Sequence, residues 1–170
     1  MTINSTQKYQ GYVLTSIATA LAKFPELSLR TISGKDRSAF SVECSLSGAE
    51  SPFVIGVYIK ISNARRSPWK YTFQRKHQEA VEMLNGVSDR TYVVFVNDDD
   101  GVACVDYDGL KELLDDHFED TEWVSVSRKL NESYRLSGKD GLLSGKTKRS
   151  AFPGTIVEAI SEALSLTAGT

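Results

Sequence analysis

The run TYVVFV, residues 91–96, is the sequence feature that most constrains the fold. An uninterrupted series of β-branched and aromatic residues, without polar alternation, is typical of a central strand that is covered on both faces. Covering both faces of a sheet requires further layers of secondary structure. We therefore expect an α/β fold in which a mixed sheet is flanked by helices.

The hydrophobic periodicity of the remaining chain divides it into helices and strands. Apolar residues at spacings of three and four predict helices over 5–24, from Thr72 to about Asn85, over 109–118 and from Pro153 onward. Alternating or continuously apolar runs predict strands over 27–33, 39–44, 53–61, 91–96, 102–107 and 123–128. The polar, glycine-containing segment 129–150 is expected to be a hairpin or a mobile loop. The expected order is α-β-β-β-α-β-β-α-β-(β)-α, and since no repeat or linker interrupts it, we expect one domain over 1–170.

Composition excludes several classes of protein. The 170 residues contain 12 Gly and 4 Pro, too few for a collagenous or Pro/Gly-rich disordered chain. No apolar run is long enough to span a membrane, and the polar opening MTINSTQKYQ does not resemble a secretory signal. Cys44 and Cys104 are widely separated, which favours free buried thiols over a disulfide or a zinc site. We expect a cytoplasmic protein.

The charges are segregated along the chain although the net charge is only −2. Between residues 51 and 78 there are six basic residues and no acidic one: Lys60, Arg65, Arg66, Lys70, Arg75 and Lys76. Between residues 98 and 122 there are eleven acidic residues and one base. Local fields depend on such clusters rather than on net charge. These segments are therefore either solvated faces or binding faces for partners of opposite charge.

The first six expected elements, helix, strand, strand, strand, helix and strand, resemble the core of the PD-(D/E)xK, or restriction-endonuclease-like, superfamily. In that family an Asp near the second strand and a (D/E)xK motif on the third hold Mg²⁺ for phosphodiester cleavage. Asp36 stands just before the second strand, and Lys60, in GVYIKIS, occupies the place of the motif lysine. Tyr58 stands where the motif has an acid. The resemblance covers residues 5–97 and leaves 98–170 as a C-terminal extension.

The resemblance implies either a Mg²⁺-dependent nuclease or a degenerate version that only binds nucleic acid. In the catalytic version, Asp36 and Glu43 would be the metal ligands, and Lys60 would stabilise charge in the transition state. No nucleotide-binding, serine hydrolase or zinc motif offers another enzymatic class.

The segment ISNARRSPWKYTFQRKHQ, residues 61–78, mixes aromatic and basic residues. Aromatic rings stack on bases and cations contact phosphates, so this mixture is suited to DNA or RNA. The same composition suits a protein interface, or a helix start whose rings are buried while its bases are solvated. On the nucleic-acid hypothesis the contacts are made by Arg65, Arg66, Trp69, Lys70, Tyr71, Arg75 and Lys76.

The acidic segment 98–122 supports a rival hypothesis. On this hypothesis a module of the immunity or anti-defence type binds a basic protein partner through Asp115 and Asp116. The rival predicts a non-catalytic protein-interaction module. A third alternative is a structural subunit of a larger assembly.

Overall fold

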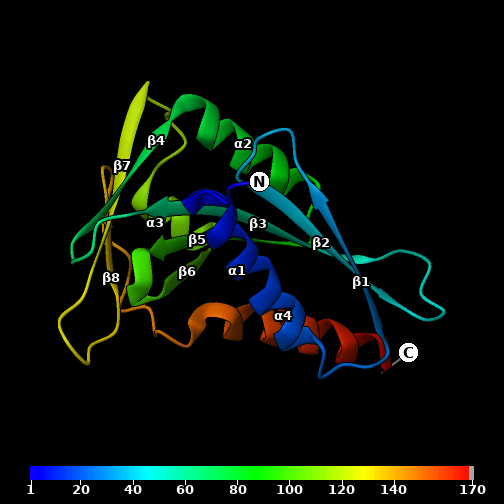
Figure 1. The fold of residues 1–170 in the computed structure, drawn as a ribbon. Helices are drawn as coiled ribbons and strands as arrows, with labels where there is room; N and C mark the ends of the chain where they lie inside the picture. Colours follow the sequence, from blue (N-terminus) through cyan, green and yellow to red (C-terminus); the bar gives the residue numbers. More distant parts are fainter. Residues whose placement is uncertain (169–170) are drawn as a thin grey trace.

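A computed structural model describes residues 1–168, which form four α-helices, eight strands and one short 3-10 helix (Figure 1). The N-terminal half contains α1 (Ser5–Leu21), β1 (Leu27–Ser33), β2 (Ala39–Leu46), β3 (Phe53–Ser62), β4 (Trp69–Gln74) and α2 (Arg75–Gly86). The C-terminal half contains β5 (Arg90–Asn97), the 3-10 turn Asp98–Asp100, β6 (Val102–Asp106), α3 (Tyr107–Leu113), β7 (Thr121–Ser127), β8 (Arg135–Gly138) and α4 (Ala151–Ala168). None of the helices within residues 1–168 combines the length and apolar character needed to cross a membrane.

Five strands form a mixed sheet in the order β1-β2-β3-β5-β6. β3 and β5 are parallel, and the other neighbouring pairs are antiparallel. The chain between the parallel strands contains α2, as a crossover connection requires. Ala39 at the start of β2 pairs with Tyr58 on β3. The turn between β1 and β2 therefore lies beside the end of β3 that carries Lys60.

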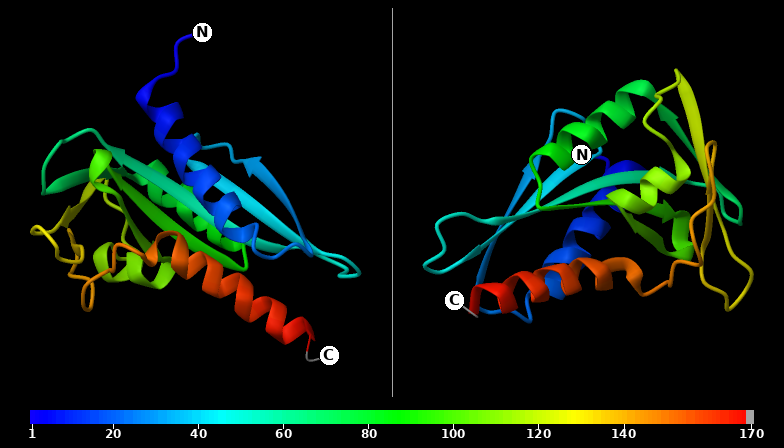
Figure 2. Two further views of the ribbon diagram at one scale, coloured as in Figure 1. Left: turned by 60° about the horizontal axis from the view of Figure 1, so that its bottom comes forward. Right: turned by 180° about the vertical axis from the view of Figure 1, so that it is seen from behind.

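The two faces of this sheet are covered by different elements, as Figure 2 shows. α1 and α4 pack on one face, where Tyr92, Val94 and Val96 contribute to the core. α2, α3 and a second sheet cover the other face, where Val93 and Phe95 are buried. The prediction that 91–96 is a central strand covered on both faces is confirmed.

The second sheet is antiparallel, with the order β4-β7-β8. At the residues of its strand β4 we expected the end of a loop and the start of a helix. The predicted helix start at Thr72 is therefore wrong. Side chains along Trp69–Gln74 alternate strictly between buried and exposed, a period of two that belongs to a strand. The aromatic residues face inward, and Lys70, Thr72 and Gln74 face outward. Helix α2 begins only at Arg75.

The predicted fold class is confirmed: helices flank a mixed sheet, and the elements follow the expected order with β4 added. Helix α3 is shorter than predicted and ends at Leu113. Segment 129–150 contains β8 and the isolated bridges Tyr134↔Thr147 and Ser137↔Leu142, so of the two expected alternatives it folds back as a hairpin.

Candidate functional site

Asp36 lies in the turn between β1 and β2, where its side chain supports the turn itself. Its Oδ1 accepts the backbone N–H of Ser38 at 2.8 Å. The carbonyl of Ser38 in turn accepts the N–H of Ile59 at 2.9 Å. These bonds hold the turn against β3, so that the Asp36 carboxylate is placed beside the side chains of that strand.

Tyr58 occupies the position of the motif acid and contacts Asp36 directly. Its side chain is fully buried, and its hydroxyl donates to Asp36 Oδ2 at 3.4 Å. Burial, followed by the charge of Asp36, raises the pKa of Tyr58, which keeps the phenol protonated. The residue is therefore a neutral hydrogen-bond donor to Asp36 and does not replace a carboxylate as a metal ligand.

Lys60 points between β3 and β4 toward the second sheet. Its Nζ donates to the carbonyl of Thr72 at 2.6 Å and lies 4.7 Å from the ring centroid of Phe73. Burial lowers the pKa of Lys60 to about 8, and the neighbouring charge of Asp36 opposes that shift. The lysine is thus held as a partly desolvated cation close to Asp36.

His77, in the first turn of α2, lies near Asp36 and Lys60. Its Nδ1 accepts the backbone N–H of Gln74 at 3.1 Å. Burial lowers the pKa of His77, as do the charges of Lys60 and Lys76, while Asp36 acts in the opposite direction. Burial and the two neighbouring cations therefore favour the neutral form of the imidazole.

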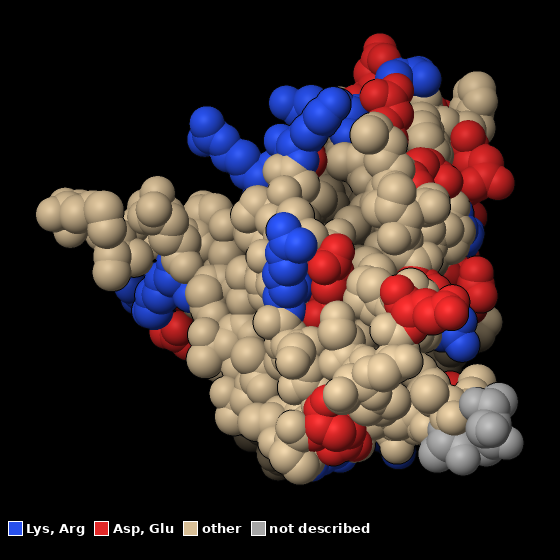
Figure 3. Space-filling model, turned by 90° about the vertical axis from the view of Figure 1, so that its right-hand side faces the viewer, with Lys and Arg blue, Asp and Glu red and all other residues tan. Residues whose placement is uncertain are grey.

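Four exposed cations flank this group, from two segments: Lys35, Arg37, Arg75 and Lys76. The first two lie on either side of Asp36 in the turn, and the others begin α2. Arg75 is paired with the exposed Asp120 at 3.8 Å. Figure 3 shows several Lys and Arg side chains near its top, with Asp and Glu side chains beside them, at the level where Figure 1 places α2 and this turn. We call Lys35, Asp36, Arg37, Tyr58, Lys60, Arg75, Lys76 and His77 the basic end.

The structure brings together Asp36 and Lys60, but it does not bring Glu43 to them. Glu43 lies four residues beyond Ala39, about 13 Å along β2 at the usual rise per residue. Its carboxylate is 4.0 Å from the guanidinium of Arg30 on the neighbouring strand. Both oxygens of Asp36 already accept hydrogen bonds. Asp36 and Glu43 therefore do not fit a shared Mg²⁺ site.

The aromatic residues proposed for stacking are not available on the surface. Trp69 is only 2% exposed and donates its Nε1–H to the carbonyl of Ala64 at 2.7 Å. Tyr71 is equally buried, and its hydroxyl lies 2.9 Å from the carbonyl oxygen of Val96. The expectation that these two rings stack on bases is wrong, because the strand alternation points them into the core.

The basic residues of the same segment remain exposed. Lys70 faces outward from β4, and Arg65 and Arg66 lie in the loop before it. Sequence reasoning missed His77, Lys35 and Arg37 as members of the site. The sequence SGKDRS does indicate Lys35 and Arg37, because these two bases flank Asp36. The position of His77 could not be inferred, because it depends on the residue at which α2 begins.

Several acidic side chains of segment 98–122 are bonded to partners within the chain, so the segment does not form a free acidic face. Arg128 holds Asp100 with two hydrogen bonds, Tyr9 donates to Asp98 at 2.6 Å, and Lys139 pairs with Glu119. Of the two residues proposed to bind a partner, Asp116 lies 3.0 Å from Lys111. The carboxylate of Asp115 accepts the N–H of His117 at 2.8 Å and lies close to Glu122 and Asp140.

Comparisons of the chain with protein-family models, with curated proteins and with solved structures give no match.

Proposed function

We propose that the protein binds nucleic acid, DNA or RNA, through the phosphate backbone at the basic end. The observation that carries this proposal is the convergence of cations from three elements. The turn between β1 and β2 supplies Lys35 and Arg37, β3 supplies Lys60, and α2 supplies Lys76, with Asp36 between them. Phosphates carry a dense negative charge, and clustered Lys and Arg side chains are the usual means of binding it.

Binding without cleavage fits these residues better than Mg²⁺-dependent hydrolysis. Tyr58 stands in place of the motif acid, and Glu43 is paired with Arg30 far along β2. Asp36 is the remaining carboxylate of the proposed ligand set, and its two oxygens already accept hydrogen bonds from Ser38 and Tyr58. These residues therefore fit the binding version of the resembled core better than the catalytic version.

The partly buried position of Lys60 supports a functional role for the basic end. A desolvated ammonium destabilises the folded chain, and perturbed lysines of this kind are concentrated at functional sites. The rival function, a protein-interaction module that uses the 98–122 face, has less support because its carboxylates are largely paired within the chain.

The test is fluorescence anisotropy of labelled single-stranded DNA, duplex DNA and RNA, measured between about 50 and about 200 mM salt. We expect binding that weakens steeply as the salt concentration rises. The double variant Lys35→Gln/Arg37→Gln should weaken binding to each sequence tested and should reduce the salt slope by about 1–2 units.

A matched control removes the same charge elsewhere. Lys23→Gln/Lys129→Gln lowers the net charge equally, but these exposed lysines follow α1 and β7, away from the basic end. We expect this control to bind like the wild type. Absence of binding at the lowest salt, or an equal loss in both double variants, would contradict the proposal.

A further inference from the structure

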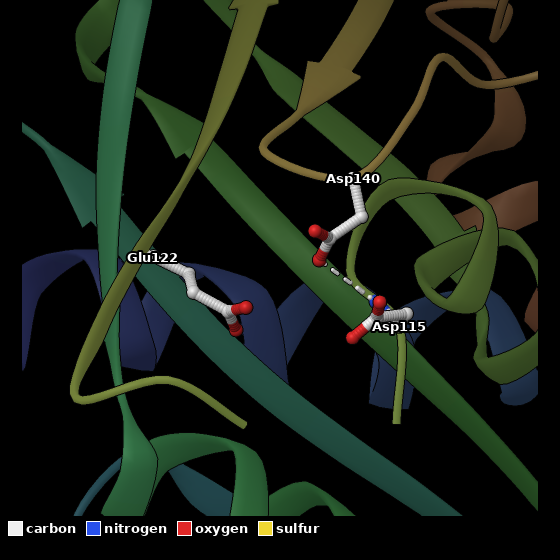
Figure 4. A group of neighbouring side chains, drawn as sticks. All are labelled: Asp115, Glu122 and Asp140. Carbon is white, nitrogen blue, oxygen red and sulfur yellow. Dashed lines mark hydrogen bonds between the residues drawn. The ribbon is translucent and has the colours of Figure 1, made fainter. Parts of the chain in front are cut away.

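Three carboxylates from separate elements meet on the side of the molecule formed by α3 and the second sheet. Asp115 follows α3, Glu122 lies in β7 and Asp140 follows β8. One oxygen atom from each lies within 4.8 Å of the others, and Figure 4 shows the carboxylates facing a common space. This cluster is separate from the residues of the basic end.

Backbone hydrogen bonds hold the two aspartates together. The N–H of Asp140 donates to the carbonyl of Leu113 at 3.0 Å, and the N–H of Asp115 donates to Asp140 Oδ2 at 3.0 Å. The approach is close, because a Cβ atom at Gly138 would lie 2.2 Å from the carbonyl oxygen of Leu113. Glycine at this position therefore allows β8 to bring Asp140 against the end of α3.

Glu122 provides a second, independent observation. Its side chain is 1% exposed, and one of its oxygens, Oε2, contacts the amide of Gln78. The other oxygen, Oε1, is buried and has no hydrogen-bond partner within the described part of the chain. A buried carboxylate oxygen without a partner is costly, and such atoms indicate a missing ligand or ion. In Figure 4 the carboxylate that carries this atom is directed toward Asp115 and Asp140.

The electrostatics of the cluster agree with a site for a cation. Three carboxylates whose oxygens lie within 4.8 Å of one another repel each other, and Lys139 is a cation close to them. The ammonium of Lys139 is paired with Glu119, so it is shared with an acid outside the cluster. A divalent cation between the three carboxylates would remove their mutual repulsion and give Oε1 of Glu122 a partner.

We propose that Asp115, Glu122 and Asp140 bind a hard divalent cation of the size of Ca²⁺. The ligand set consists only of carboxylate oxygens, which hard cations prefer to soft ones. Because the three oxygens all lie within 4.8 Å of one another, one ion can lie within about 2.8 Å of all three, close to the upper end of the Ca²⁺–oxygen range. The bound ion would link the end of α3 to β7 and β8 and would thereby stabilise the packing of the second sheet on the rest of the molecule.

The test uses the full chain after treatment with a chelator. Thermal unfolding is followed without metal, with Ca²⁺ and with Mg²⁺, and binding of Ca²⁺ is measured by calorimetry. Because the ion binds the folded state, we expect Ca²⁺ at about tenfold its dissociation constant to raise the midpoint by about 3 °C. Mg²⁺ should have less effect, since it requires a more regular octahedral site.

Isosteric variants assign the effect to these residues. Asp140→Asn and Glu122→Gln should each abolish the shift caused by Ca²⁺, whereas the exposed acids Asp108 and Glu158 provide the controls Asp108→Asn and Glu158→Gln, which should keep it. Luminescence of Tb³⁺, a Ca²⁺ substitute, provides a readout that does not depend on stability. Trp123 adjoins Glu122 and should sensitise that luminescence, and Asp140→Asn should remove it.

Three results would overturn the proposal. They are the absence of calorimetric heat and of any shift with millimolar Ca²⁺, a shift that persists in both cluster variants, and a shift with Mg²⁺ that Ca²⁺ does not produce. A shift confined to the wild type and the two controls would support it.

Discussion

Lys60 is a charged side chain whose environment differs strongly between the folded and the unfolded protein. The pKa of an exposed lysine is near 10.5, and burial lowers that of Lys60 to about 8. A difference of this size corresponds to a cost of about 3 kcal/mol at neutral pH, of which the bond to Thr72 and the contact with Phe73 offset a part. The folded protein therefore tolerates this cation at the expense of stability.

Replacing Lys60 should stabilise the protein in a pH-dependent manner. We expect Lys60→Met to raise the free energy of unfolding at pH 7 by about 1–3 kcal/mol. The penalty in the wild type is fully present below the folded pKa of about 8 and disappears as the pH rises toward 10.5, where the unfolded chain also loses its proton. The stability gain of the variant should therefore shrink over this range in urea unfolding experiments.

The exposed Lys70 offers a control for that measurement. Lys70→Met removes the same charge from the outer side of β4 and should change stability little at either pH. A gain at Lys60 that is independent of pH would show that the ammonium is not desolvated in the folded state.

Strand β4 is the element that sequence reasoning interpreted incorrectly. The segment WKYTFQ is short and lies directly before a helix, so its composition predicts the end of a loop followed by a helix cap at Thr72. The strand is defined by its partner: Trp69 through Gln74 pair with Val126 through Thr121 on β7, which is about fifty residues away in the sequence. Such a long-range pairing overrides a local capping signal.

The alternation along β4 can be tested by the cost of truncating neighbouring side chains. Tyr71→Ala removes a buried ring that packs edge-on against Phe95, and it should lower the free energy of unfolding by about 3–5 kcal/mol. Lys70→Ala, one position earlier, should change it by less than about 0.5 kcal/mol. Chemical denaturation of both variants measures the difference, and similar costs at the two positions would be inconsistent with a strand here.

Asp100 connects the two sheets of the molecule. It lies in the turn between β5 and β6, and its carboxylate accepts bonds from Arg128, after β7, and from Tyr134 at 2.9 Å. Burial acts to raise the pKa of Asp100, but the hydrogen bonds from Arg128 and Tyr134 outweigh it, and the net pKa is lowered. The pairing therefore stabilises the packing of the second sheet on the first.

Breaking this connection should change both stability and its dependence on acid. We expect Asp100→Asn to lower the free energy of unfolding at pH 7 by about 2–4 kcal/mol, because Arg128 loses its charged partner. A carboxylate with a lowered folded pKa contributes stability above its unfolded pKa, and that contribution is lost as the pH falls through the folded value. The difference between wild type and variant should thus diminish below about pH 4, and a constant difference down to pH 2.5 would contradict the assignment.

The chain's fold class was predictable because periodicity is a local property. The run 91–96 and the alternating strand 39–44 contain their own signals, and both occupy the expected places in the five-stranded sheet. The site was only partly predictable. Asp36 and Lys60 come together because the register between β2 and β3 places the turn before β2 beside Lys60. The hydrophobic pattern of the two strands fixes that register. The separation of Glu43, the burial of Trp69 and the clustering of Glu122 with Asp140 all depend on how β4, β7 and β8 pair.

The most direct test of the proposed function is an NMR titration of the ¹⁵N-labelled protein with a short oligonucleotide at low salt. We expect the amide shifts to change most in the turn that contains Lys35 and Arg37 and in the first turn of α2 around Lys76, and to return toward their free values as salt is added. Shifts confined to the acidic segment 98–122, or an unchanged spectrum at saturating oligonucleotide, would contradict binding at the basic end.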